Sequence, residues 1–229
     1  MESSNATLEP RAARRPLKSR GSATIRRVAA ALGRGGVTPN TISLASMAFA
    51  GATASCFVGL AHTGSATVVV LLLAGAIAGI QLRLLCNLID GLVAVEGGKK
   101  TATGDLFNEV PDRVADTLVL AGAGYAIGWL SWGPELGWAA ALAAALTAYV
   151  RVLGGSLGLE QSFSGPMAKQ QRMALVTLAC LASMAEAGGG LNGYALAAAL
   201  ALITGGSLLT CWLRLRGIAR GLNARKEAV

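Results

Sequence analysis

The stretch NLIDGLVAVEGGKKTATGDLFNEVPDRVAD, residues 87–116, decides how the chain folds, because it places acids where one long apolar run ends and the next begins. Six of the twelve acidic residues lie between Asp90 and Asp116. An ionisable group in a membrane span costs free energy, so such groups are functional candidates. The stretch therefore predicts two neighbouring helices with a polar site where they meet.

Six apolar runs in the chain are long enough to cross a hydrocarbon core of about 30 Å as helices. Only 14% of the residues are charged, against about 25% in soluble domains, and the mean hydropathy is +0.54. We therefore expect an all-α membrane protein with six transmembrane helices, at about 41–62, 66–89, 104–130, 134–153, 168–187 and 191–213.

A short amphipathic helix is predicted ahead of the first span, between Ser22 and Gly33. Arg26 and Arg27 lie off its apolar face, as expected for a juxtamembrane helix on an anionic inner leaflet. For residues 1–20, a disordered basic tail and an organellar transit peptide are alternatives. The expected organisation is a basic tail and interfacial helix (1–34), a membrane domain (35–215) and a basic cytoplasmic tail (216–229). The apolar face comprises Ile25, Val28, Ala29 and Leu32.

The 20 Lys and Arg residues all fall near span ends on one predicted side of the membrane. Positive charge near span ends stays in the cytoplasm, so we expect a multi-pass protein of the cell (inner or plasma) membrane with both termini cytoplasmic. This topology explains the net charge of +8. With only 5% aromatic residues, no nucleic-acid partner is expected.

Polar faces of two successive helices can meet in this arrangement. Arg83, Asn87 and Asp90 share one face of the second span. Carboxylate and amide oxygens suit a hard cation such as Mg²⁺, Mn²⁺ or Ca²⁺, and no Cys or His joins them to favour zinc. The alternative is that Arg83, Arg113 and the acids only pair structurally. On the third span, an arc of about 100° holds Asp105, Asn108, Glu109, Asp112 and Asp116.

Residues 87–112 resemble the motif of the CDP-alcohol phosphatidyltransferase family, D-x2-D-G-x2-A-R-x8-G-x3-D-x3-D, with every spacing kept. Thr38-Pro39-Asn40 also resembles the family's sequence before its first span. Asn87 and Asn108 stand at two Asp positions, and Val95 stands at the Arg position. The matching identities are Asp90, Gly91, Ala94, Gly104 and Asp112.

The resemblance implies a site with Mg²⁺ or Mn²⁺ on the diphosphate of a CDP-linked lipid. Asp112 would be the general base on the acceptor hydroxyl. Loss of two Asp is partly balanced by Asp105 on the same face, so either Asp105 or Glu109 replaces the missing ligand or the site holds one cation instead of two. The implied metal ligands are Asp90, Asn87, Asn108 and Asp105, and the implied nucleotide-binding residues are Gly91, Ala94, Gly104 and Asn40.

Basic residues on the same membrane side, Arg151, Lys169 and Arg172, are expected to hold phosphate, although setting the topology alone would also explain them. The function expected from the resemblance is transfer of a phosphatidyl group from a CDP-activated lipid to an acceptor alcohol, with release of CMP, by a homodimer among membrane lipids. The acceptor stays open. A divergent member that binds a nucleotide lipid without transfer and a small membrane transporter are the alternatives.

Overall fold

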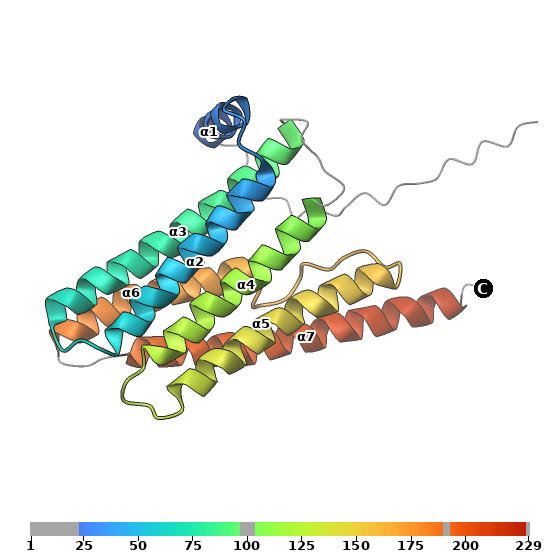
Figure 1. The fold of residues 1–229 in the computed structure, drawn as a ribbon. Helices are drawn as coiled ribbons and strands as arrows, with labels where there is room; N and C mark the ends of the chain where they lie inside the picture. Colours follow the sequence, from blue (N-terminus) through green and yellow to red (C-terminus); the bar gives the residue numbers. More distant parts are fainter. Residues whose placement is uncertain (1–22, 97–103, 190–192, 228–229) are drawn as a thin grey trace, which may run out of the picture.

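The computed structural model describes residues 23–96, 104–189 and 193–227, which form seven helices (Figure 1). The all-helical prediction is confirmed over these residues. The predicted tail at residues 1–22 and the side chains of Ala94, Asp105 and Asn108 lie outside what the structure describes. The helices are α1 (Ala23–Arg34), α2 (Pro39–Leu60), α3 (Ala66–Glu96), α4 (Gly104–Tyr125), α5 (Gly133–Ser156), α6 (Lys169–Gly188) and α7 (Tyr194–Glu227).

Helices α2 to α7 form a closed ring in which the neighbours follow the order α2, α3, α6, α7, α5 and α4. Four of these, α2, α3, α5 and α7, are long and apolar enough to cross a membrane. Helices α4 and α6 also occupy predicted spans, but their inward-facing charges lower the hydropathy of their sequences. A main core of buried apolar side chains fills the ring, with contributions from all six helices.

Three helix ends differ from their predicted positions by five residues or more, and one of them is that of α3, which runs to Glu96 instead of residue 89. Helix α4 stops at Tyr125 instead of residue 130, because residues 126–132 turn back toward α5 with bonds such as Ile127 N to Gly124 O (3.2 Å). Helix α7 continues past Leu213 to Glu227, so most of the predicted C-terminal tail is helical. Basic residues in the last turn of α7 favour this extension, because cations stabilise a helix C-terminus.

Helix α1 forms where the amphipathic pattern predicts it and packs on α3 outside the ring. Its Ala29 is buried with Ile42, Ile89 and Val93, and Ile25 and Leu32 pack against this small core. Val28, which the pattern also placed on the apolar face, is 43% exposed. The side of α1 that carries Val28 is therefore turned away from α3.

Side-chain oxygens satisfy the first turns of two ring helices. Thr38 precedes α2, and its Oγ1 accepts a hydrogen bond from Thr41 N at 3.2 Å. At the other end of the bundle, the Glu186 carboxylate accepts bonds from the backbone N–H groups of Gly193, Tyr194 and Ala195 at 2.7–3.1 Å. A carboxylate is favourable at a helix N-terminus, so Glu186 links the end of α6 to the start of α7.

Helices α4 and α5 touch backbone to backbone at Gly124. A Cβ added there would lie 2.5 Å from the carbonyl oxygen of Gly133 and 2.8 Å from the Cα of Gly137. Because both obstacles are backbone atoms, no rotamer change relieves the clash. The close contact of α4 with α5 requires glycine at this position.

Replacing Gly124 with Ala is expected to lower the free energy of unfolding by about 1–3 kcal/mol, because the two helices must separate. Thermal unfolding in detergent measures the loss. Gly51→Ala is the matched control, since nothing lies within 4 Å of a Cβ there, and it should be neutral or stabilising. Equal melting temperatures for the two variants would contradict the close-contact argument.

Candidate functional site

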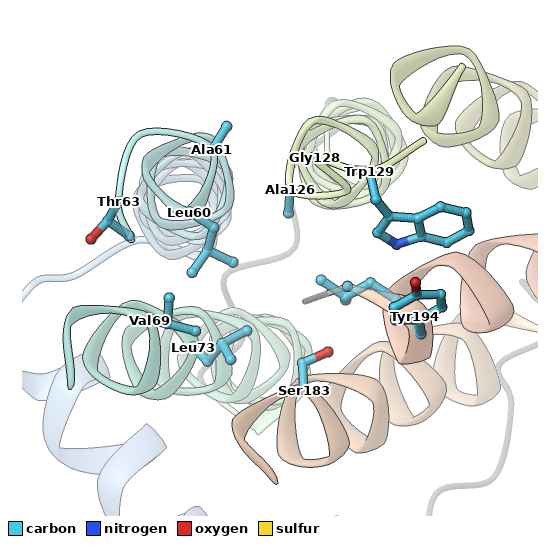
Figure 2. Close-up of a pocket in the computed structure, with 12 residues that line it drawn as sticks. Leu60, Ala61, Thr63, Val69, Leu73, Ala126, Gly128, Trp129, Ser183 and Tyr194 are labelled. Carbon is cyan, nitrogen blue, oxygen red and sulfur yellow. The ribbon is translucent and has the colours of Figure 1, made fainter. Parts of the chain in front are cut away.

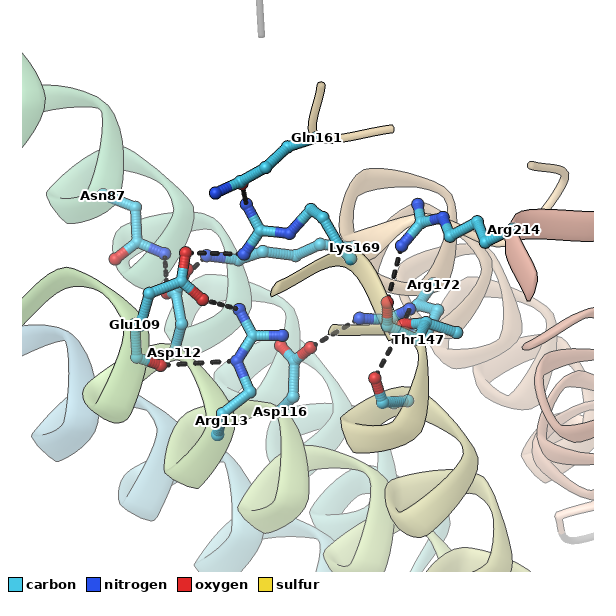
Figure 3. A network of polar contacts seen from close by, with 12 residues as sticks. Asn87, Glu109, Asp112, Arg113, Asp116, Thr147, Gln161, Lys169, Arg172 and Arg214 are labelled. Atoms are coloured by element: carbon cyan, nitrogen blue, oxygen red, sulfur yellow. Dashed lines mark hydrogen bonds and ion pairs between the residues drawn. The ribbon is translucent and has the colours of Figure 1, made fainter. Parts of the chain in front are cut away.

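Acidic side chains line one face of α4 at increasing depth. The side chains of Glu109, Asp112 and Asp116 are 37%, 15% and 5% exposed, one helical turn apart. This face meets α3, α5 and α6 near the end of the ring where α4 begins (Figure 3). Because the side chains are buried more deeply from Glu109 to Asp116, only Glu109 and Asp112 are open to a ligand.

Asp116 is held between two buried arginines from neighbouring helices. Arg83 Nη2 of α3 contacts one carboxylate oxygen, and Arg172 Nη2 of α6 lies 2.8 Å from the other. Arg172 also donates to Met167 O at 2.9 Å and to Thr147 Oγ1 at 3.3 Å. Both arginine side chains are almost fully buried. These contacts leave Asp116 no face for a substrate and make it a link between α3, α4 and α6.

Asp112 lies one turn nearer the end of the bundle and is partly open. Asn87 of α3 donates from Nδ2 to Asp112 Oδ1 at 2.8 Å, and Lys169 of α6 contacts the same oxygen through Nζ. Arg83 Nη2 is 3.9 Å from that oxygen. The predicted meeting of the two polar helix faces is confirmed by these contacts. Every contact that the structure describes from a side chain to the Asp112 carboxylate falls on Oδ1.

Asp90 of α3 is hydrogen-bonded to α2. Its Oδ2 accepts a hydrogen bond from Ser43 Oγ at 2.8 Å, and its side chain is buried. Asn40, which is half-buried, lies one turn before Ser43 in α2, so it is on the same side as Asp90. Gly91 follows in α3, and Gly104 begins α4 across the undescribed residues 97–103.

Glu109 binds two arginines at the outer edge of the acidic face. Its Oε2 lies 3.2 Å from Arg113 Nη2, and its Oε1 contacts Arg151 of α5. Arg151 also donates to Gln161 Oε1 at 3.3 Å and lies over the Phe163 ring at 5.1 Å. The ion pairing that was the alternative for Arg83 and Arg113 is therefore present. Asp112 and Asp90 also have contacts outside these ion pairs.

A cavity of about 300 Å³ opens between α5 and α7 beside this edge. It is lined by Arg151 and Arg214, with Ser162 and Ser164 from the loop between α5 and α6. Arg214 is buried and donates to Thr147 O at 2.6 Å and to Ser164 O at 2.9 Å. In the sequence, Arg214 counted only among the 20 basic residues that indicate the topology. Arg214 follows Thr210 by four residues, which places both on one face of α7. That spacing is the signal that would have indicated a buried Arg214.

A second cavity, of about 350 Å³, lies at the opposite end of the bundle (Figure 2). Its lining includes Leu73, Ser183 and the stacked rings of Trp129 and Tyr194. No Asp, Glu, Lys, Arg or His is among its described lining residues. This cavity therefore lacks the groups that bind a diphosphate or transfer a proton at neutral pH.

The donor set of the acidic site suits a hard divalent cation. Asp90, Asp112 and Asn87 offer carboxylate and amide oxygens, and no cysteine or histidine lies in this group. Among the residues whose side chains are described, no three acids, cysteines or histidines converge on one point. With only two carboxylates in reach, the described residues fit one such cation.

The fold of the chain, a closed ring of six helices, is similar to that of several solved structures. Three of these are structures of phosphatidylinositol phosphate synthase (PgsA1) from Mycobacterium tuberculosis. With CDP-DAG bound, that protein matches with a TM-score of 0.67 at 19% identity over 86% of this chain and 94% of its own. With manganese and citrate, the values are 0.65, 19%, 85% and 88%.

The apo form of the same protein gives a TM-score of 0.62 at 20% identity, over 83% of this chain and 93% of that one. No family model and no curated protein sequence matches the chain. The expected fold is thus confirmed, and the motif in residues 87–112 stays a prediction.

Asp116→Asn is expected to destabilise the protein by about 3–5 kcal/mol, because it removes the close counter-charge of two buried arginines, leaving Arg83 only Asp112 at 3.9 Å. Chemical unfolding in detergent, followed by tryptophan fluorescence, measures the change. Glu135→Gln, a substitution in the exposed first turn of α5, is the control and should change stability little. A stability loss below 1 kcal/mol would contradict the role of Asp116 as a link between helices.

Proposed function

We propose that this chain is a membrane transferase that moves a phosphatidyl group from a CDP-linked lipid to an acceptor alcohol and releases CMP, in phospholipid biosynthesis. The observation that carries the proposal is Asp112, a partly exposed carboxylate where α3, α4 and α6 meet, at the last position of the family motif. The fold shared with a synthase whose structure contains CDP-DAG supports the donor.

Mg²⁺ or Mn²⁺ is the proposed cofactor. Asp90 and Asn87 of α3 would hold it, with Asp105 and Asn108 contributing from the first turns of α4. When bound, the cation would neutralise diphosphate charge and stabilise the leaving phosphate of CMP. A structure of PgsA1 contains manganese, which agrees with this choice of metal.

The nucleotide is proposed to lie against the ends of α2, α3 and α4. Gly91, Ala94 and Gly104 are small residues of the motif, and small side chains let a ligand approach the helix backbone closely. Asn40 lies on the α2 side of Asp90 and offers an amide to the same ligand. These four residues are the proposed nucleotide site.

Asp112 is proposed to be the general base. Its Oδ1 is occupied by Asn87 and Lys169, so Oδ2 would take the proton of the acceptor hydroxyl. The acceptor oxygen then forms a bond to the lipid-side phosphorus, the bond from that phosphorus to the bridging oxygen breaks, and CMP leaves with the bonding electron pair. Asp116 cannot replace Asp112, because both of its oxygens bind buried arginines.

The acceptor is proposed to carry a phosphate that enters the cavity between α5 and α7. Arg151 and Arg214 line this cavity, and Arg151 also contacts Glu109 at the edge of the acidic face. Lys169 contacts Asp112 on this face and would contact phosphate as well. Arg172, which the sequence placed in the phosphate site, is buried against Asp116 and is better assigned to positioning α6.

In the membrane, we propose six transmembrane helices, α2 to α7, with both termini in the cytoplasm and α1 on the inner leaflet. The clustering of charged side chains at one end of the ring supports this orientation. Exposed small and apolar side chains on the outside of the ring support a homodimer among membrane lipids. A transporter is disfavoured, because the described lining of the cavity at the opposite end carries no charge to continue a polar path.

The reaction is tested with purified protein, Mn²⁺, CDP-diacylglycerol and a panel of phosphorylated and neutral alcohols, with CMP release as the measurement. We expect release with a phosphorylated acceptor, and a fall of about 10²-fold or more in Asp112→Asn, because the base is lost. Glu135→Gln should keep the wild-type rate. Binding of CDP without CMP release from any acceptor would instead favour a divergent nucleotide-lipid binder.

Two substitutions at the cavity edge should act in opposite directions. Glu109→Gln removes the carboxylate that competes for Arg151 and should lower the KM for a phosphorylated acceptor, whereas Arg151→Gln should raise it, each by up to about tenfold. Initial rates at saturating donor give these values. Neutral alcohols serve as the control, since their KM should not respond. A shift in the same direction for both variants would contradict phosphate binding at Arg151.

A further inference from the structure

Lys169 places its ammonium group against the Asp112 carboxylate, beside the proposed cation site. Its Nζ contacts Asp112 Oδ1, the oxygen that also accepts from Asn87 Nδ2 at 2.8 Å. Arg83 Nη2 lies 3.9 Å from that oxygen. One carboxylate oxygen thus faces two positive charges and an amide donor before any cation binds.

The amide of Asn87 is turned the wrong way for a second metal at this point. A metal ligand must present an oxygen lone pair, but Asn87 presents its NH₂ group to Asp112. The Asp that the family pattern has at this position would present oxygen on both sides. The substitution therefore replaces a possible bridge between two cations with a hydrogen bond to Asp112.

The local charge points the same way. Asp90 and Asp112 carry two negative charges, which one divalent cation neutralises. A second divalent cation on Asp112 would lie close to both the Lys169 ammonium and the Arg83 guanidinium, and like charges at such distances repel strongly in a partly buried site. The described residues therefore favour one divalent cation together with one fixed ammonium.

Lys169 also stands at an unfavourable place for helix stability. It is the first residue of α6, where the helix dipole disfavours a cation, and no acid lies in the first turn to offset it. Its side chain is 23% exposed, so it remains open to a ligand while it binds Asp112. The contact with Asp112 explains a lysine at this position, and so do the N–H donors that its ammonium group offers to a bound phosphate.

We propose that the ammonium of Lys169 takes the place of one of the two divalent cations that the motif implies, so that this site holds one metal ion and one lysine. The inference rests on the proposed function and deepens it. Lys169 Nζ orients the Asp112 carboxylate, and it offers its remaining N–H donors to a phosphate oxygen of the donor lipid. Asn87 and Lys169 thus act on the same carboxylate oxygen of Asp112.

Mn²⁺ stoichiometry tests this without relying on turnover. Purified protein in detergent is titrated with Mn²⁺ in the presence of CDP, and free Mn²⁺ is followed by electron paramagnetic resonance. We expect one Mn²⁺ per wild-type chain. Restoring acids in Asn87→Asp with Asn108→Asp should still give one, because the ammonium remains. Adding Lys169→Met to that pair should give two.

Lys226→Met is the matched control, because Lys226 is an exposed lysine in the last turn of α7 far along the chain from Asp112. It should leave one Mn²⁺ bound with unchanged affinity. Lys169→Arg, which keeps the positive charge, should also bind one, and it guards against loss of folding in Lys169→Met. Thermal unfolding confirms that each variant is folded before titration.

Two Mn²⁺ per wild-type chain, or one Mn²⁺ in the folded triple variant, would overturn the inference. The CMP assay separates this result from the proposed function. Two Mn²⁺ with CMP release would remove the role of Lys169 and leave the transferase intact. One Mn²⁺ in the wild type and two in the triple variant, without CMP release from any acceptor, would support the mixed site and sink the transfer reaction.

Discussion

The ion triad of Asp116 with Arg83 and Arg172 sets the register of three helices, and the candidate site depends on it. Each functional side chain around Asp112 lies one helical turn from a member of the triad and toward the same end. Asn87 follows Arg83 by four residues, Asp112 precedes Asp116 by four, and Lys169 precedes Arg172 by three. Fixing three buried charges against one another therefore brings the three outer groups within contact distance.

The triad explains why so polar a cluster is tolerated inside an apolar ring. Buried ions cost free energy to remove from water, and a buried pair repays this only with good geometry and further hydrogen bonds. Arg172 obtains such bonds from Met167 O and Thr147 Oγ1. Stability alone would be served equally well by apolar residues, so the cluster is better understood as a device for placing the partly exposed carboxylate of Asp112.

Helical periodicity was enough to place the polar faces of α3 and α4 and to foresee that they meet, because spacing along a helix determines direction around it. It could not show which partner each charge would take. Arg172 and Lys169 are one turn apart, yet one is buried on Asp116 and the other reaches Asp112. Arg214 was missed because its partners, Thr147 and Ser164, come from other segments. Such choices depend on the order of helices in the ring, which no local pattern contains.

Helix α7 forms hydrogen bonds with the loop between α5 and α6 at several points from one end of the loop to the other. With 34 residues it is about 51 Å long, well beyond the roughly 30 Å of a hydrocarbon core. Thr210 accepts from Met167 N, Arg214 holds Ser164 O, and Arg225 binds the carbonyls of Leu157 and Gly158. Because translation proceeds toward the C-terminus, these anchors are the last part of the bundle to be made. The cavity beside Arg151 is therefore completed only after α7 is made, so a chain still emerging from the ribosome carries the acids of α4 before this cavity is closed.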